Sequence, residues 1–142
     1  MVLQLSVFLK NRPGELRKVT QMLADNKIDI RALTVAETAD YGILRLIVNK
    51  PEECYKLLQS KNFLVGKTDI LAVEMADHPG GLHKIASVFG DAGVNIEYMY
   101  AFAYKETAIL LIQVSNEHRA TAVETLDANK IKIFSPEEIY QI

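Results

Sequence analysis

The sequence predicts an α+β fold built from two tandem copies of one β-α-β-β-α-β unit. The chain matches itself when it is shifted by 66 residues: NRPGEL at 11–16 returns as DHPGGL at 77–82, and no gap is needed up to Val48. In both copies, alternating apolar stretches and stretches with helical spacing follow one another in the same order. Apolar residues make up 49% of the 142 residues, which is enough for a packed core.

The first copy contains four expected strands and two expected helices. The strands alternate or are rich in β-branched residues, and they cover 3–9, 28–37, 41–48 and 63–65. The first helix, 14–26, has apolar residues at helical spacing and ends on Asn26, a residue suited to a C-cap. Pro51 stands where a helix start tolerates proline, so a second helix is expected over 52–60.

The second copy repeats this order. Its expected strands are 69–75, 94–104, 107–114 and 130–134. Its first helix, 80–92, is closed by Gly93, and its second begins at Ser115 or Asn116. The run SPEE at 135–138 has the form of a capping box, which predicts a last helical turn.

A β-α-β-β-α-β unit folds as a ferredoxin-like four-stranded antiparallel sheet with both helices on one face. The faces that we expect under the helices carry Leu44, Leu46 and Val48 in the first copy and Leu110, Ile112 and Val114 in the second. The opposite faces carry Ile43, Arg45, Ile47, Ile109, Leu111 and Gln113. These faces are too apolar to stay in water, so we expect them to pack against something and to support a homodimer.

The predicted domains are 1–66 and 67–142, the second including the short C-terminal helical turn. The linker between them, GKTD at 66–69, is too short for independent domains.

Charge and hydropathy exclude several classes of partner. The net charge of −2, without a long run of one sign, argues against nucleic acid or an anionic membrane, because both require a basic surface. No stretch approaches the roughly 18 apolar residues of a membrane span, and the N-terminus alternates like a strand instead of resembling a signal peptide. Cys54 is the single cysteine, and we expect it to be a small hydrophobe on a helix. The default expectation is a cytoplasmic protein.

The repeated turn joins the first strand to the first helix in each copy. Proline keeps the preceding residue extended, and the following glycine permits unusual dihedrals and a close backbone approach. The first N–H groups of the next helix lack intrahelical partners and attract anions. The turn lacks the spacing of a nucleotide-binding loop. It either holds one small anionic group, such as the α-carboxylate of an amino acid, or serves only as a tight turn.

These features together resemble the ACT domain. The resemblance is carried by the proline-glycine turn after a strand, the amphipathic helix, and GVNI at the next strand, most fully over 71–100. It covers nearly the whole chain as two tandem ACT domains. It implies a regulatory module whose domains pair with their sheets side by side and bind free amino acids at the seam.

The resemblance also implies site residues. In amino-acid-binding members of the family, an Asn two residues before the Pro contacts the ligand, and a second Asn reaches in from the partner domain. This implies one family-like site across the two copies, formed by Asn11, Arg12, Pro13, Gly14, Glu15, Leu16, Asn95 and Ile96. It implies a second, altered site formed by Asp77, His78, Gly80, Gly81, Leu82, Asp29 and Ile30.

The altered site has Asp at both Asn positions. Two carboxylates repel an α-carboxylate, so this site is expected to be empty, to prefer a basic group, or to hold a ligand in another orientation. The alternative for the Asn and Asp residues of both sites is that they cap local backbone groups.

Tyr98, Tyr100, Phe102 and Tyr104 alternate along one expected strand of the second copy. In a regular strand, these side chains would lie on the same face as Ile96, which predicts packing in the core or between the copies. Tyr98 or Tyr100 could also line the ligand pocket. An RNA-stacking platform would need the basic surface that is missing.

No constellation for catalysis is present. His78, His83 and His118 are scattered without metal-ligand spacing, and no Ser or Cys nucleophile has an identifiable base. We therefore expect no enzyme activity, no metal and no cofactor.

The sequence as a whole predicts a sensor that binds a free amino acid and acts through a partner or through its own assembly. The alternatives are a regulatory subunit of an amino-acid biosynthetic enzyme and, less favoured, an RNA-binding ferredoxin-like module.

Overall fold

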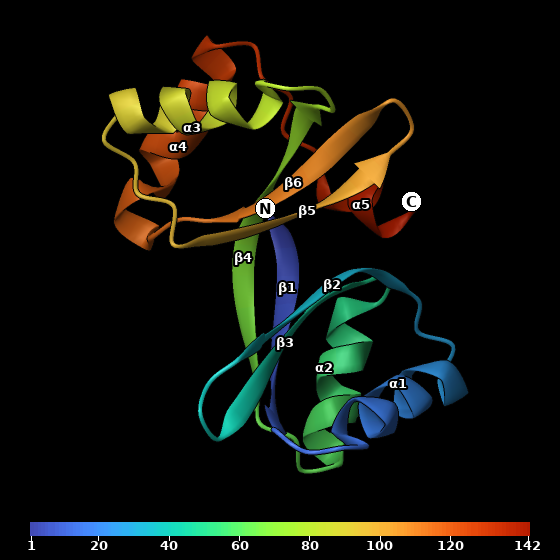
Figure 1. Cartoon of the computed structure of the whole chain (residues 1–142). Helices are drawn as coiled ribbons and strands as arrows, with labels where there is room; N and C mark the ends of the chain where they lie inside the picture. The colour runs from blue at the N-terminus through green and yellow to red at the C-terminus, as the bar shows by residue number, and fades with distance from the viewer. The chain divides into compact units, whose positions relative to one another are not determined.

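The computed structural model describes residues 1–142, which form two compact units (Figure 1). The N-terminal unit comprises Leu3–Asp69 together with Pro136–Ile142. The C-terminal unit comprises Met1–Val2 together with Ile70–Ser135. None of the helices combines the length and the apolar character that crossing a lipid bilayer requires.

The N-terminal unit is an antiparallel sheet with two helices. Its elements are β1 (Val2–Lys10), α1 (Glu15–Asp25), β2 (Ile30–Glu37), β3 (Tyr41–Val48), α2 (Pro51–Ser60), the first part of β4 (Val65–Ala76), and α5 (Pro136–Tyr140). Hydrogen-bonded neighbours run β2-β3-β1-β4, the order expected of the predicted unit. Strand β3 covers the predicted residues, and Pro51 begins α2 as expected.

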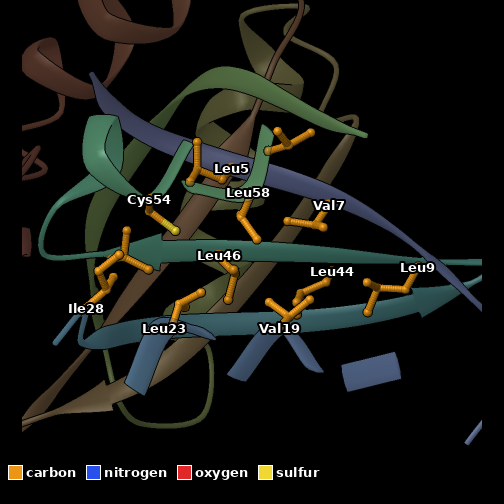
Figure 2. Close-up of a cluster of buried hydrophobic side chains, with 12 residues drawn as sticks. Leu5, Val7, Leu9, Val19, Leu23, Ile28, Leu44, Leu46, Cys54 and Leu58 are labelled. Atoms are coloured by element: carbon orange, nitrogen blue, oxygen red, sulfur yellow. The ribbon is translucent and has the colours of Figure 1, made fainter. Parts of the chain in front are cut away.

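The helix-covered face of this sheet forms the core of the N-terminal unit. Leu44, Leu46 and Val48 pack there with Val19 and Leu23 of α1, as predicted, and Figure 2 shows the cluster. Cys54 and Leu58 add the contribution of α2, and both are fully buried. Burial raises the pKa of the Cys54 thiol to about 11, with a smaller contribution from the charge of Glu53. The thiol therefore stays protonated near neutral pH and serves in packing.

The C-terminal unit repeats the arrangement. Its elements are the rest of β4, α3 (Gly81–Asp91), β5 (Tyr98–Tyr104), β6 (Thr107–Gln113), the 3₁₀ turn η1 (Asn116–His118) and α4 (Arg119–Ala128). Neighbours run β4-β6-β5. Residues 132–134 pair with the second part of β4 through an isolated bridge between Val73 and Ile133, so the expected strand 130–134 does not form in full. The Glu74 N–H donates to the Lys132 carbonyl at 2.9 Å, and the Phe134 N–H donates to the Ala72 carbonyl at 2.8 Å.

The core of the C-terminal unit also lies under its helices. Leu110, Ile112 and Val114 pack with Ile85 and Phe89 of α3, as predicted. Ala122 and Leu126 of α4 complete the cluster.

The four longer helices end in the same way. Each is followed by a residue with positive φ: Lys27, Asn62, Gly93 and Lys130. After α1, the Lys27 N–H donates to Ala24 and the next N–H donates to Leu23, a Schellman pattern that satisfies carbonyls at the helix end. Gly93 closes α3 and Asn26 caps α1, as predicted, the Asn26 side chain donating to the Met22 carbonyl at 2.8 Å.

The expected linker at 66–69 lies inside a strand. Residues 65–76 form one continuous strand, β4, whose first part is the last strand of one unit and whose second part is the first strand of the other. Next to its start, the Phe8 N–H donates to the Leu64 carbonyl at 3.0 Å. Pairing with β1 therefore overrides the polar, turn-like composition of GKTD.

The C-terminal helix associates with the first copy, whereas the predicted division at residue 66 placed it with the second. The Leu3 N–H donates to the Tyr140 hydroxyl at 2.9 Å, and Arg31 Nε donates to the Tyr140 carbonyl at 3.0 Å. These bonds hold α5 on β1 and β2 of the N-terminal unit.

The open sheet faces, opposite the helices, are partly buried. Ile47, Ile109 and Leu111 are fully buried, while Ile43, Arg45 and Gln113 are half-buried. The expectation that these faces are covered is confirmed for Ile47, Ile109 and Leu111.

The aromatic stripe lies on the open face. Tyr100 pairs with Leu111 and Phe102 with Ile109, so the stripe stands opposite the helix-covered core. The prediction of core packing is therefore wrong, and its alternative, packing between the copies, stays a prediction. Strand β5 begins only at Tyr98, and the parity of Ile96 does not carry across the irregular residues before it.

We expect Leu58→Ala to lower the free energy of unfolding by about 2–5 kcal/mol, because it leaves a cavity in the core. Leu64→Ala is the matched control, since 69% of Leu64 is exposed, and it should cost less than about 0.5 kcal/mol. Urea denaturation of both variants measures the difference, and equal losses would contradict the assignment of the core.

Candidate functional site

In each unit, the turn between the first strand and the first helix contains a glycine in the left-handed region. Gly14 precedes α1 with φ of 86°, and Gly80 precedes α3 with φ of 90°. The Lys18 N–H donates to the Gly14 carbonyl at 3.2 Å, and the Lys84 N–H donates to the Gly80 carbonyl at 3.1 Å. The backbone conformation of each turn therefore requires a glycine, whether or not the turn also binds a ligand as predicted.

The turn of the N-terminal unit contains a largely buried carboxylate, Glu15, that is paired with two exposed basic side chains. Glu15 Oε1 accepts from Arg12 Nε at 2.7 Å and from Lys18 Nζ at 3.2 Å, and only 10% of the Glu15 side chain is exposed. The hydrogen bond from Arg12, followed by that from Lys18, holds the pKa of Glu15 below its ordinary value, although burial acts in the opposite direction. The chain thus supplies its own carboxylate at the start of α1.

The turn of the C-terminal unit has no such carboxylate. Gly81 stands at the position of Glu15, and a Cβ there would lie 2.0 Å from the Ala76 carbonyl oxygen. The Gly81 N–H donates to the His78 carbonyl at 3.0 Å. The start of α3 therefore approaches the end of β4 more closely than any side chain at position 81 allows.

A pocket of about 290 Å³ opens beside Gly81, entirely within the C-terminal unit. Its apolar wall comes from Met75, Ile85 and Ile131. The remaining lining residues are mostly polar or charged: Glu74, Ala76, His78, Gly81, Lys84, Thr107, Lys130 and Lys132.

Sequence reasoning named His78 and Gly81 but missed the lysines of this pocket. Two signals were available. Lys84 repeats Lys18 at the 66-residue shift, and Lys130 and Lys132 alternate in the stretch 130–134 that the sequence predicts as a strand, although Lys130 in fact lies in the turn after α4.

The other residues of the predicted family-like site are divided between the units. Asn11, Pro13 and Leu16 are exposed in the N-terminal unit, where the Asn11 N–H donates to the Asp40 carbonyl at 3.4 Å. In the C-terminal unit, Asn95 is exposed and Ile96 packs against the core. The joining of Asn11 with Asn95 stays a prediction.

The predicted altered site is divided in the same way. Asp77 and Leu82 are exposed in the C-terminal unit. In the N-terminal unit, Ile30 packs against the core, and Asp29 Oδ2 accepts from Arg31 Nη1 at 3.0 Å. The Asp29 backbone N–H donates to Asn49 Oδ1 at 2.9 Å, so this residue has local partners, as its capping alternative requires.

No group of three or more His, Cys, Asp and Glu residues is arranged to hold a metal ion. The Nε2 atom of His83 lies 3.3 Å from the Ser87 hydroxyl, one turn along α3. His78 Nδ1 lies 2.9 Å from the Pro79 carbonyl oxygen within the exposed turn.

Comparisons with known proteins agree with this architecture. A family model described as an ACT domain pair matches residues 1–142. A crystal structure of a protein from Bacteroides thetaiotaomicron is 38% identical, with a TM-score of 0.93, and the match covers 99% of this chain and 96% of that one. No curated protein matches.

Two more distant structures share the fold. The regulatory subunit of aspartate kinase from Thermus thermophilus, in a ligand-free form, is 20% identical with a TM-score of 0.64, and the match covers 89% of this chain and 91% of that one. The same subunit from Thermus flavus is 19% identical with a TM-score of 0.62, and the match covers 89% and 90%.

We expect Gly81→Ala to lower the free energy of unfolding by about 1–3 kcal/mol, because the new Cβ displaces backbone at the end of β4. Gly90→Ala, in the same helix with nothing near its Cβ, should instead raise it by up to about 1 kcal/mol. Chemical denaturation of both variants checks the contrast, and a harmless Gly81→Ala would contradict the close approach.

We expect Glu15→Gln to destabilise the protein in a pH-dependent way. The pKa of Glu15 is lower in the folded chain than its ordinary value of 4.5, so its stabilisation is fully present above that value. The difference from the parent protein should disappear as the pH falls through the lowered pKa. Denaturation curves from pH 7 to acid measure it, and Glu117→Gln, which removes an exposed carboxylate, should show no such trend.

Proposed function

We propose that this chain, which belongs to the ACT domain pair family, is a non-catalytic regulatory protein. Its proposed ligand is a free amino acid. The observation that carries the proposal is the family match over the whole chain, together with the same left-handed glycine turn before the first helix of each unit. The proposed ligand lies at a seam between the two domains, 1–66 and 67–142, with their sheets side by side.

The family-like site would use Asn11 and the turn at 12–16 from one domain, and Asn95 with Ile96 from the other. The exposure of Asn11 and Asn95 in their own units supports this, because both amides are accessible to a ligand. The altered site would be the weaker of the two for an amino acid, since Asp77 and Asp29 add negative charge and Asp29 is already paired with Arg31.

A ligand at the seam regulates only if it binds one state of the protein better than another. In the absence of catalysis, the readout would be the affinity for a partner or the assembly of the chain itself. A homodimer would engage the accessible apolar residues of the N-terminal open face, Phe8 at 40% exposed and its cross-strand neighbour Ile43. A cytoplasmic location is part of this proposal.

A second candidate is a dedicated regulatory subunit of an amino-acid biosynthetic enzyme. The fold shared with the regulatory subunits of aspartate kinase favours it. Purification of the tagged chain from its own cells distinguishes the two, because a subunit would bring down a stoichiometric larger enzyme.

We expect at least one of the twenty amino acids to raise the melting temperature of the native chain, since a ligand of the native state stabilises it. Asn95→Ala should weaken that binding by about tenfold or more in calorimetry, whereas Asn116→Ala, which removes another exposed amide of the C-terminal unit, should not. Undiminished binding by Asn95→Ala would contradict the family-like site.

A further inference from the structure

We propose that the pocket beside Gly81 binds a small organic dicarboxylate, one carboxylate of which takes the role that Glu15 has in the N-terminal unit. The pocket lies wholly within the C-terminal unit, so the proposal does not depend on a seam between domains. The proposal assigns His78 and Gly81 to this pocket, whereas the sequence assigned them to the altered amino-acid site.

The two copies carry the same basic positions around different central residues. In the N-terminal unit, Arg12 and Lys18 flank the Glu15 carboxylate at 2.7 and 3.2 Å. The corresponding residues of the C-terminal unit, 66 positions later, are His78 and Lys84, with Gly81 between them. The second copy has therefore kept the lysine, replaced the arginine by a histidine, and lost the carboxylate that the first copy places between such residues.

The loss of that carboxylate leaves the lysines near Gly81 without an acidic partner from the turn. Gly81 is required by the close approach of α3 to Ala76, whose carbonyl oxygen occupies the place of a Cβ, and the pocket opens beside these two residues. Neither Lys84 nor Lys130 forms an ion pair with a carboxylate of the chain. A carboxylate entering the pocket would meet lysines whose charge the protein leaves uncompensated.

Positive charge is concentrated at this pocket. Residues 67–142 contain eleven Asp and Glu but only six Lys and Arg, and three of those six line the pocket. The one acidic lining residue is Glu74, while Lys132 also lies over the Phe134 ring at 4.4 Å. Lys84 and Lys130, which form no ion pair, supply two positive charges at the lining, the number that neutralises a dianion.

The volume of the pocket limits the ligand to a small molecule. Its volume of about 290 Å³ lies just below the roughly 300–1,000 Å³ of sites for drug-sized ligands. The wall of Met75, Ile85 and Ile131 suits a short methylene spacer between two carboxylates. A carboxylate fits better than an inorganic oxyanion, because the group held at the matching position of the first copy is a carboxylate on an aliphatic chain.

The test is calorimetric titration of the full chain with glutarate at low ionic strength. Glutaramide, which has the same spacer without charge, and inorganic phosphate are the comparison probes. The Lys84→Gln/Lys130→Gln double variant removes two pocket charges, and Lys56→Gln/Lys61→Gln removes two exposed charges of the N-terminal unit as a matched control. Lys84→Arg keeps the charge at the pocket.

We expect glutarate to bind, the pocket double variant to lose about tenfold or more in affinity, and the control variant and Lys84→Arg to bind like the parent. The proposal would be overturned if glutarate did not bind, or if both double variants lost the same affinity. It would also be overturned if glutaramide or phosphate bound as well as glutarate. Asn95→Ala should leave glutarate binding unchanged, so this site and the proposed amino-acid site can fail separately. Loss of glutarate binding in Asn95→Ala would show that the pocket is not an independent site.

Discussion

The left-handed glycine at the start of the first helix is the constraint on which each unit depends. Gly14 and Gly80, with φ of 86° and 90°, turn the chain from the end of a strand directly into a helix. The helices that follow present Val19 and Leu23, or Ile85 and Phe89, to the sheet. A residue with a Cβ would be strained in this conformation, so the turn and the packing of the helix on the sheet depend on the same glycine.

The residue directly after that glycine makes the two units chemically different. Glu15 carries a carboxylate that its own neighbours neutralise, whereas Gly81 allows a closer approach of helix and strand and borders a pocket. One duplicated turn thus encodes an internally satisfied helix start in one unit and an accessible basic cavity in the other. Divergence within one repeated turn, here at three of its six positions, is how a repeated scaffold acquires unequal sites.

Local patterns predicted most of the elements correctly because local forces decide them. Strand β3, the start of α2 at Pro51, the end of α3 at Gly93 and the helical turn after Ser135 follow from alternation, from the fixed φ of proline and from capping chemistry. The predictions that failed involve long-range pairing. GKTD is polar and turn-like, yet it lies within β4. Tyr100 pairs with Leu111 on the face away from the helices, because the irregular residues 94–97 break its alternation with Ile96.

The sequence by itself determined the duplication, the α+β order of each copy, the residues under the helices and the glycine turns, because each is written in short-range periodicity or in one residue's backbone preference. Only the tertiary structure decided that one strand serves both units, that α5 belongs with the first, and that Lys84, Lys130 and Lys132 surround one cavity. These features bring together residues far apart in the chain. Their proximity is set by packing and strand pairing, which no local pattern encodes.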